Sequence, residues 1–413
     1  MAHEISRRRL LGSIAGAGVA GAGLAIAGGS ASVAAPASVV TEPAVPFHGP
    51  HQAGISTDVQ DQLAFAAFDV STTDPTELVT MLKSWTAAAE AMTRGAPVPG
   101  DSTSAAVPPA DTGEAEGLAP SRLTVTVGFG PGLFDGRFGL ANRRPAALQP
   151  LPALPGELLD DAGSGGDIAV QACADDPQVA FHVIRNLARL GRGTVVTRWT
   201  QLGFGRTSVT GSGQATPRNL LGFKDGTRNI RGDDSAALDQ HVWVGSQSDQ
   251  AWLHGGTYLV ARRIRMYVEN WDRDYLSDQQ AVFGRTKADG APLTGTAESD
   301  PPDFAATGAD GAPVIAHNAH IRLAAAENNG GLRILRRGYS FTDGIDPATG
   351  TLEAGLFFLS YQSDPAAFVT LQRKLGASDA LNEYIQHVGS GVFACPPGVS
   401  GSGDHWGSAL FDA

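Results

Sequence analysis

One aspartate of the chain lies in a short turn between two glycines. In the stretch GFKDGTRN, residues 222–229, Asp225 directly precedes Gly226 and follows Gly222 by three residues. Glycine at both positions permits a tight turn and a close approach of the backbone to a neighbouring group. The residues just before the turn are apolar, which a simple surface turn would not need. Asp225 is therefore a candidate for a functional carboxylate.

Two histidines lie three residues apart in the stretch HNAHIRL. On a helix, His317 and His320 would share a face, and such a pair can supply half of a zinc site. No glutamate lies inside the stretch, and Glu327 is the first acid that follows it. A single histidine here could instead bind haem iron.

Three arginines crowd the otherwise apolar stretch RILRRGYSF: Arg333, Arg336 and Arg337. If this stretch is a strand, Arg336 and Arg337 point to opposite faces, and one of them must face the interior of a sheet or a cavity. A buried guanidinium needs an anionic or polar partner. An arginine, an aspartate and a histidine of this kind would together form a pocket for a reactive ligand.

The elements that must position these residues follow a recurring pattern. Three segments, which start at Leu63, Ile168 and Leu356, each consist of an apolar run of strand length, a polar stretch, Asp-Pro and an amphipathic helix. The aspartate caps the helix, and the proline takes the first helical position, where no backbone donor is needed. A fourth, looser copy starts at Tyr258, and its helix is expected to open at Ser277 without a proline.

Further strand candidates start at Arg122, Thr194, Leu332 and Gly391. The order is strand, helix, strand, strand, helix, strand, and then the same again. This order predicts the α+β class, with two tandem ferredoxin-like domains that have antiparallel sheets and peripheral helices. The expected domains are residues 58–215 and 216–413.

The N-terminal segment has the pattern of an export signal. Residues 6–13, SRRRLLGS, contain consecutive arginines, and an apolar segment rich in Gly and Ala follows. Small residues offer a cleavage site near Ala34 or Ala35. We expect residues 1–36 to be a twin-arginine signal peptide and residues 37–57 to be a flexible linker. The protein would then be extracellular or lie in the cell envelope or periplasm, with no stable membrane span after processing. The alternative is an uncleaved membrane anchor, for which the segment is rich in glycine.

Charge and cysteine content narrow the classes of function. The 413 residues carry a formal net charge of -12. Nucleic acids and anionic membranes need a basic face, so we expect neither as a partner. The two cysteines, Cys173 and Cys395, form no CxxC motif, and they are either separate buried thiols or one disulfide.

The motifs GFKDGTRN, HIRL and RILRRGYSF, in this order and spacing, resemble those of the dye-decolorising peroxidases. The similarity is to the twin-arginine-exported branch, also called deferrochelatase/peroxidase. The stretches GTYLVARRIRMYVENWD, FGRTKADGAPL and YIQHVGSGVFACPPG resemble that branch as well. The resemblance covers most of residues 58–400. A GxxDG motif alone is unspecific, whereas the three motifs together are specific.

The resemblance implies two ferredoxin-like halves with one haem b in the second. It makes His320 the iron ligand, Asp225 the catalytic carboxylate above the opposite face of the haem, and Arg337 the catalytic arginine beside it. An acid should orient the histidine through its second ring nitrogen. The best match for this acid is Glu383, and Asp379 is the alternative.

Two further arginines, Arg228 and Arg322, are candidates to bind the haem propionates. In this reading, Asp225 moves a proton between the two oxygens of hydrogen peroxide, and Arg337 stabilises the charge on the leaving oxygen.

The resemblance implies a haem b peroxidase that uses hydrogen peroxide to oxidise dyes, phenolics or other reductants through a ferryl intermediate. Large dyes would not enter the pocket, so electrons would pass inward from a surface aromatic residue; the candidates are Tyr267, Trp252, Trp271, Tyr339 and Tyr384. The alternative function is haem binding with release of iron, in which case the protein would have partners in an iron-uptake system. A haem-binding module without turnover is a third interpretation, against which Asp225 and Arg337 argue.

Overall fold

The computed structural model describes residues 44–411, which belong to one compact unit. The expected signal peptide, residues 1–36, and the first part of the expected linker lie outside the described residues. The rest of that linker is packed into the fold, since Gln52 and Ile55 are buried and the Gln52 side-chain amide donates to the carbonyl of Val127 at 2.9 Å. Among the described residues, no helix combines the length and apolar character needed to cross a membrane.

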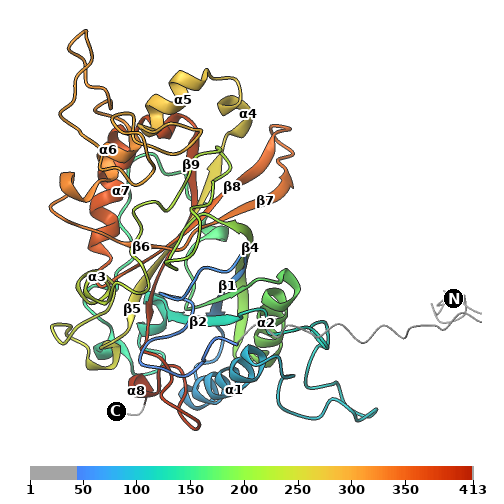
Figure 1. Ribbon diagram of the computed structural model, residues 1–413. Helices are drawn as coiled ribbons and strands as arrows, with labels where there is room; N and C mark the ends of the chain where they lie inside the picture. Colours follow the sequence, from blue (N-terminus) through green and yellow to red (C-terminus); the bar gives the residue numbers. More distant parts are fainter. Residues whose placement is uncertain (1–43, 412–413) are drawn as a thin grey trace, which may run out of the picture. The chain divides into compact units, whose positions relative to one another are not determined.

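The first half forms four antiparallel strands with two helices. The strands are β1 (Gln62–Val70), β2 (Thr124–Phe129), β3 (Ile168–Ala174) and β4 (Val195–Arg206), and the helices are α1 (Pro75–Thr93) and α2 (Pro177–Leu190). The strands lie in the order β2-β3-β1-β4, and α1 and α2 lie side by side against the sheet (Figure 1).

The second half repeats this strand order with different helices. Its strands are β5 (Thr257–Met266), β6 (Leu335–Arg336), β7 (Tyr339–Ile345), β8 (Leu352–Gln362) and β9 (Ile385–Cys395). Its helices are α3 (Ser235–His241), α4 (Val268–Trp271), α5 (Leu276–Phe283), α6 (His320–Ala324), α7 (Ala366–Ser378) and α8 (Ser408–Phe411). The pairings give the order β9-β5-β8-β7, so in both halves the fourth strand pairs with the first and the first with the third.

The two halves share one sheet. Strand β4 pairs with β7, and β2 pairs with β9, so that eight strands close into a barrel-like ring; β6 pairs with β8 beside it. The predicted antiparallel sheet with helices is therefore confirmed. The sheets of the two halves are joined edge to edge, which leaves no free edge at these strands.

The helix starts agree with the Asp-Pro pattern. The Asp74 carboxylate accepts from the backbone N–H of Thr76 at 2.7 Å, and the Asp176 carboxylate accepts from that of Gln178 at 2.7 Å. Before α7, Asp364 accepts from the N–H of Ala366 at 2.8 Å. The looser fourth copy also forms a strand and a helix, although α5 begins one residue before the expected position.

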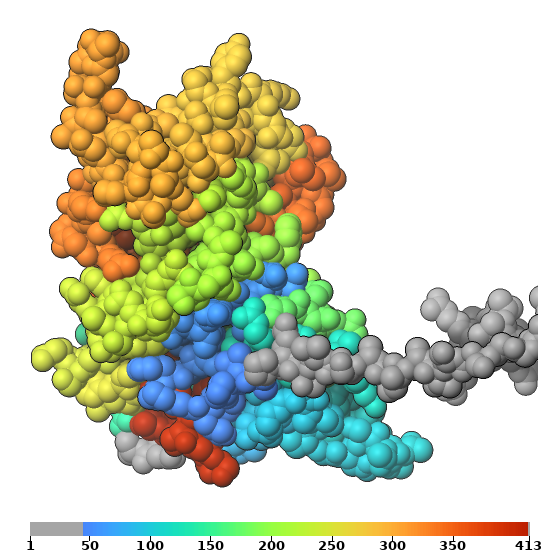
Figure 2. Space-filling view, in the orientation of Figure 1, coloured from blue at the N-terminus to red at the C-terminus, as the bar shows by residue number. Residues whose placement is uncertain are grey.

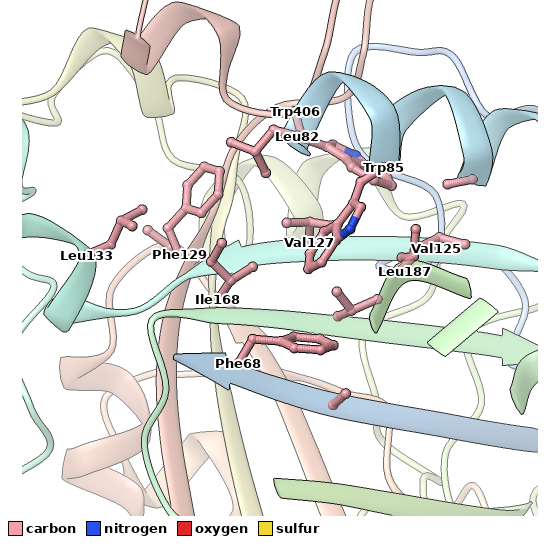
Figure 3. Packing of buried hydrophobic residues seen from close by; sticks show 14 of the residues in the cluster. Phe68, Leu82, Trp85, Val125, Val127, Phe129, Leu133, Ile168, Leu187 and Trp406 are labelled. Carbon is pink, nitrogen blue, oxygen red and sulfur yellow. The ribbon is translucent and has the colours of Figure 1, made fainter. Parts of the chain in front are cut away.

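Two large apolar clusters fill the described fold, and a smaller third cluster around Phe223, Trp271 and Phe283 lies beside them. One large cluster lies between the sheet and the helices of the first half, where Leu82 and Trp85 of α1 face Phe68 and Val127 (Figure 3). The other large cluster fills the barrel interior and includes both cysteines, which are free and buried. Of the two alternatives, separate thiols or one disulfide, the structure has two separate thiols.

The stretch RILRRGYSF does not form one continuous strand. Strand β6 ends at Arg336, and β7 begins at Tyr339. Between them, the backbone N–H of Arg337 donates to the carbonyl of Leu359 at 2.8 Å. This break decides where the neighbouring arginines lie.

Candidate active site

A cavity of about 550 Å³ lies in the second half of the chain. Its volume is within the range of pockets that bind small molecules and cofactors. Strands β5 and β8 and helices α5, α6 and α7 contribute apolar side chains to its wall, including Ile264, Phe283, Leu356, Phe358 and Leu371. Among the polar residues of the lining are Asp225, His320, Arg336 and Asp379.

His320 is the first residue of α6, and its orientation is fixed by Asp379. The distance from His320 Nδ1 to Asp379 Oδ2 is 2.6 Å, and the other carboxylate oxygen accepts from the N–H of Leu381 at 2.9 Å. With Nδ1 bound to the carboxylate, Nε2 is the ring nitrogen left for a metal. Burial opposes protonation of His320, but the charge of Asp379 outweighs it and raises the pKa of the imidazole above its ordinary value.

The expected partner of His320, Glu383, does not reach it. The side chain of Glu383 is exposed, whereas Asp379, the alternative, is buried and lies against the imidazole. The expectation for Glu383 is therefore wrong. The reason is local, because residues 380–383 form a short 3₁₀ turn that starts at Asp379 and leads Glu383 out to solvent.

His317 is exposed and lies before α6 begins, so it does not share a helix face with His320. Across residues 44–411, no group of three or more His, Cys, Asp or Glu side chains is placed to hold a metal ion. The zinc alternative therefore lacks its remaining ligands.

Asp225 contributes to the cavity together with Arg336. Arg336 Nη1 donates to Asp225 Oδ1 at 2.6 Å. The Asn219 amide donates to the other oxygen at 3.4 Å. The flanking glycines are required by geometry, because Gly222 and Gly226 have φ angles of +83° and +102°. A Cβ at Gly226 would also lie 3.1 Å from the backbone of Ser208.

Arg337 does not line the cavity, so the structure contradicts its expected place beside Asp225. Its side chain is completely buried, and Nη1 donates to the carbonyl of Thr57 at 2.6 Å. Nη2 donates to the side-chain oxygen of Gln60. Because neighbouring residues point to opposite sides at the end of β6, Arg336 reaches the cavity and Arg337 reaches the other side of the sheet.

Of the two arginines that were expected to bind the haem propionates, only one lines the cavity. Arg228 lines the cavity and forms an ion pair with Glu327 at 2.6 Å. Arg322 is directed elsewhere, since Nη2 donates to the carbonyls of Phe304 at 2.6 Å and Ile315 at 2.7 Å. Arg322 thus holds the loop before α6, and its expected contact with a cofactor is not supported.

Three cationic residues that were not expected in the site also line the cavity: Lys224, Arg285 and Arg333. All three lie in stretches that carried the family resemblance, Lys224 in GFKDGTRN, Arg285 in FGRTKADGAPL and Arg333 in RILRRGYSF, but none of them was assigned a role there.

A buried polar network also borders the cavity. Arg262 and His387 lie in stretches that carried the family resemblance, but their pairing was not predicted. Arg262, completely buried, pairs with Glu157, and its Nε donates to His387 Nδ1 at 3.2 Å. The second ring nitrogen of His387 lies 3.1 Å from the Gln372 amide. Burial, and then the charge of Arg262, lower the pKa of His387 to about 3. His387 is therefore a neutral, structural histidine.

These observations define a class of protein. A histidine with one nitrogen bound to a carboxylate and the other available, in an apolar cavity of cofactor size, has the donor set of a histidine-ligated haem site. A carboxylate and an arginine in the same lining are suited to proton transfer and charge stabilisation.

Comparisons with known proteins identify the family. Residues 52–205 match the description "Dyp-type peroxidase, N-terminal", and residues 216–400 match "Dyp-type peroxidase, C-terminal". The chain therefore belongs to the Dyp-type peroxidase family. The resemblance stated from the motifs is confirmed, as is the class of activity, that of a haem-dependent peroxidase.

Relatives cover nearly the whole chain. A deferrochelatase from Shigella sonnei is 39% identical over 418 residues, 99% of this chain and 97% of that protein. A deferrochelatase from Yersinia pseudotuberculosis is 40% identical over 89% of this chain and 85% of that protein. The structure of ferric DtpA from Streptomyces lividans is 38% identical with a TM-score of 0.83, covering 92% of this chain and 100% of that chain.

Proposed function

We propose that the cavity holds one haem b and that the protein is a peroxidase for hydrogen peroxide and small reductants or dyes. The observation that carries this proposal is the pair His320–Asp379, which leaves one imidazole nitrogen for iron in the lining of an apolar cavity that also contains Asp225 and Arg336.

The cavity residues fit this cofactor. The apolar wall suits a porphyrin ring, and His320 Nε2 would hold the iron. Arg228 and Arg333 line the same cavity and are the candidates to bind the propionates. Asp379 holds the proton on Nδ1 and makes the imidazole a stronger donor.

Haem, when bound, supplies the redox chemistry between hydrogen peroxide and the reductant. Asp225 accepts a proton from one peroxide oxygen and returns it to the other. Arg336 stabilises the negative charge that develops on the leaving oxygen. The hydrogen bond from Arg336 at 2.6 Å also holds the carboxylate in place. We therefore assign to Arg336 the role that the sequence suggested for Arg337.

A test compares the absorption spectrum of the purified holoprotein before and after one equivalent of peroxide, for the wild type, His320→Ala, His317→Ala and Asp225→Asn. His320→Ala should lose most of the haem, whereas His317→Ala should keep it. Asp225→Asn should keep haem and react roughly 100- to 10,000-fold more slowly with peroxide. Equal haem content in the two histidine variants, or a normal rate in Asp225→Asn, would contradict the assignments.

Release of iron from haem is the second candidate function, favoured by relatives of 38–40% identity that are named deferrochelatase. The same cavity would hold the haem, and the iron would pass to an iron-uptake system. The test is the fluorescence of metal-free porphyrin after incubation of the holoprotein without peroxide. If Asp225→Asn still forms metal-free porphyrin, release of iron does not depend on the group proposed for the reaction with peroxide.

We also propose that the chain is exported by the twin-arginine route to the periplasm, cell envelope or exterior. The arginines at positions 7–9 and the apolar segment rich in Gly and Ala support this proposal. A variant with lysine at all three positions should accumulate inside the cell as haem-loaded precursor.

Each half of the chain is proposed to be a ferredoxin-like domain. The equal strand order in the two halves and the βαββαβ sequence of the first support this assignment. The boundary is placed near residue 216, with residues 58–215 and 216–413 as the two domains.

A further inference from the structure

The turn that carries Asp225 is held from both sides by one carboxylate, that of Glu298. Lys224, which directly precedes Asp225, forms an ion pair with Glu298. Thr227, two residues after Asp225, donates from its hydroxyl to Glu298 Oε1 at 3.1 Å. The carboxylate thus spans the turn and joins the residues before and after Asp225.

The surroundings of Glu298 favour its ionised form. Its side chain is 23% exposed. Burial opposes ionisation, but hydrogen bonds from Lys224, Thr216 and Thr227 outweigh it, and the pKa of Glu298 lies below its ordinary value. A charged acceptor makes stronger hydrogen bonds than a neutral one.

Glu298 belongs to the loop of residues 286–314, which is tied to the same turn at a second place. Arg218 Nη1 donates both to the carbonyl of Gly222 at 2.7 Å and to that of Lys287 at 2.6 Å. Arg285, buried in the cavity wall, donates to the carbonyl of Glu298 at 3.1 Å. In Figure 2, the orange atoms that include this loop lie next to the yellow-green atoms of the region that includes the turn.

The turn lies outside the regular elements of the described fold. Residues 222–229 belong to no helix and to no strand of the main sheet. Inside the turn, the N–H of Asp225 donates to the carbonyl of Pro217 at 2.9 Å. The position of the carboxylate therefore depends on the side chains that bind the turn.

We propose that Glu298 is a positioning residue for Asp225, and that the loop of residues 286–314 is thereby a functional part of the active site. The proposal rests on the proton-transfer role proposed for Asp225. Displacement of a reacting group by about 1 Å can cost about 100-fold in rate. Loss of the negative charge of Glu298 weakens its contacts on both sides of Asp225 and leaves the ammonium of Lys224 without its anionic partner.

The test is the stopped-flow rate of the first reaction with peroxide in haem-loaded protein. Glu298→Gln should keep haem content and thermal stability and should slow this reaction between about 10- and 100-fold. The matched control is Glu90→Gln. Glu90 is 26% exposed and pairs with Arg94 at 2.5 Å on α1, and its loss should leave the rate unchanged. A normal rate in Glu298→Gln would overturn the proposal.

A second experiment, with double variants, distinguishes a loss of positioning of Asp225 from a general perturbation of the structure. In the Asp225→Asn background, Glu298→Gln should cause no further slowing, because the group that it positions is already absent. Equal slowing in both backgrounds would overturn the proposal. A normal rate in Asp225→Asn alone would instead refute the proposed role of Asp225. If Glu298→Gln fails to fold, Thr227→Val removes one of the two contacts and should show a smaller slowing with the same dependence on Asp225.

Discussion

At the scale of single residues, two adjacent arginines have different tasks. Arg336 lines the cavity and binds Asp225, and Arg337 lies buried against the carbonyls of Thr57 and Asp58. The sequence indicated that one of the pair had to face inward. It could not indicate which one, because a break in the strand decides the direction of each side chain.

Arg336→Leu should slow the first reaction with peroxide about 100- to 1,000-fold with little change in haem content, because it removes the charge beside Asp225. Arg337→Leu should instead lower the free energy of unfolding by at least about 2 kcal/mol, because buried acceptors lose their donor. Stopped-flow rates and urea unfolding of both variants distinguish the two tasks. A slow but fully stable Arg337→Leu would contradict this division.

The assignment of Asp379 as the acid that binds His320 can be tested by measuring the haem reduction potential. Asp379→Asn removes the negative charge of the carboxylate that binds Nδ1 of His320, which weakens the imidazole as a donor and should raise the potential of the ferric/ferrous couple. Glu383→Gln, a change at an exposed side chain, is the control and should leave the potential unchanged. Spectroelectrochemical titration measures both, and a shift confined to Glu383→Gln would reverse the assignment.

His387 should make the stability depend on pH. Its pKa in the folded state, about 3, is below the ordinary value of about 6.5 for an unfolded histidine. Between these values the unfolded state binds more protons, so the contribution of His387 to stability is complete above about pH 6.5 and is lost as the pH falls. In His387→Gln, urea unfolding between pH 4 and 7 should depend less steeply on pH. If the free energy of unfolding depends on pH as steeply in His387→Gln as in the wild type, groups other than His387 determine this dependence.

At the scale of elements, the local sequence pattern predicted where helices begin but did not predict the turns. The Asp-Pro starts of α1 and α2 were predicted because an aspartate cap and a proline at the first position are local features. The break between Arg336 and Tyr339 depends on pairing with β8, which lies farther along the chain. Asp379 was similarly ambiguous, because the turn after it decides whether it or Glu383 reaches His320.

The cap of α2 provides a test at this scale. Asp176 accepts from the N–H groups of Gln178 and Val179. Asp176→Ala should therefore lower the free energy of unfolding by about 1 kcal/mol. Asp239→Ala, at an exposed position of α3, should change it by less than about 0.5 kcal/mol. Equal effects in chemical denaturation would argue against the cap.

At the scale of the whole molecule, strands from the two halves pair with each other and close one sheet into a ring. The sequence predicted the strands and their order but treated each half as a sheet of its own. Pairing of β4 with β7 and of β2 with β9 joins residues that are far apart in the chain. No local pattern of hydrophobic residues specifies such a pairing, so the closed ring could not be predicted from the sequence.

Residues 44–215 expressed alone should fail to fold cooperatively, because β2 and β4 lose their partners β9 and β7. The full-length holoprotein should unfold in a single transition. Thermal unfolding followed by near-ultraviolet circular dichroism compares the two. A sharp transition in the isolated half would show that the first four strands are stable without the second half.

Among the strands of residues 44–411, the closing strand β9 is the last to be synthesised. Until residues 385–395 emerge, β2 and β5 each lack a neighbour, and the nascent chain carries open sheet edges of the kind that pair with other chains. Ring closure therefore comes only after strands β1–β8 have been synthesised. A premature stop codon before β9 would leave a product that lacks its final strand and is prone to aggregate.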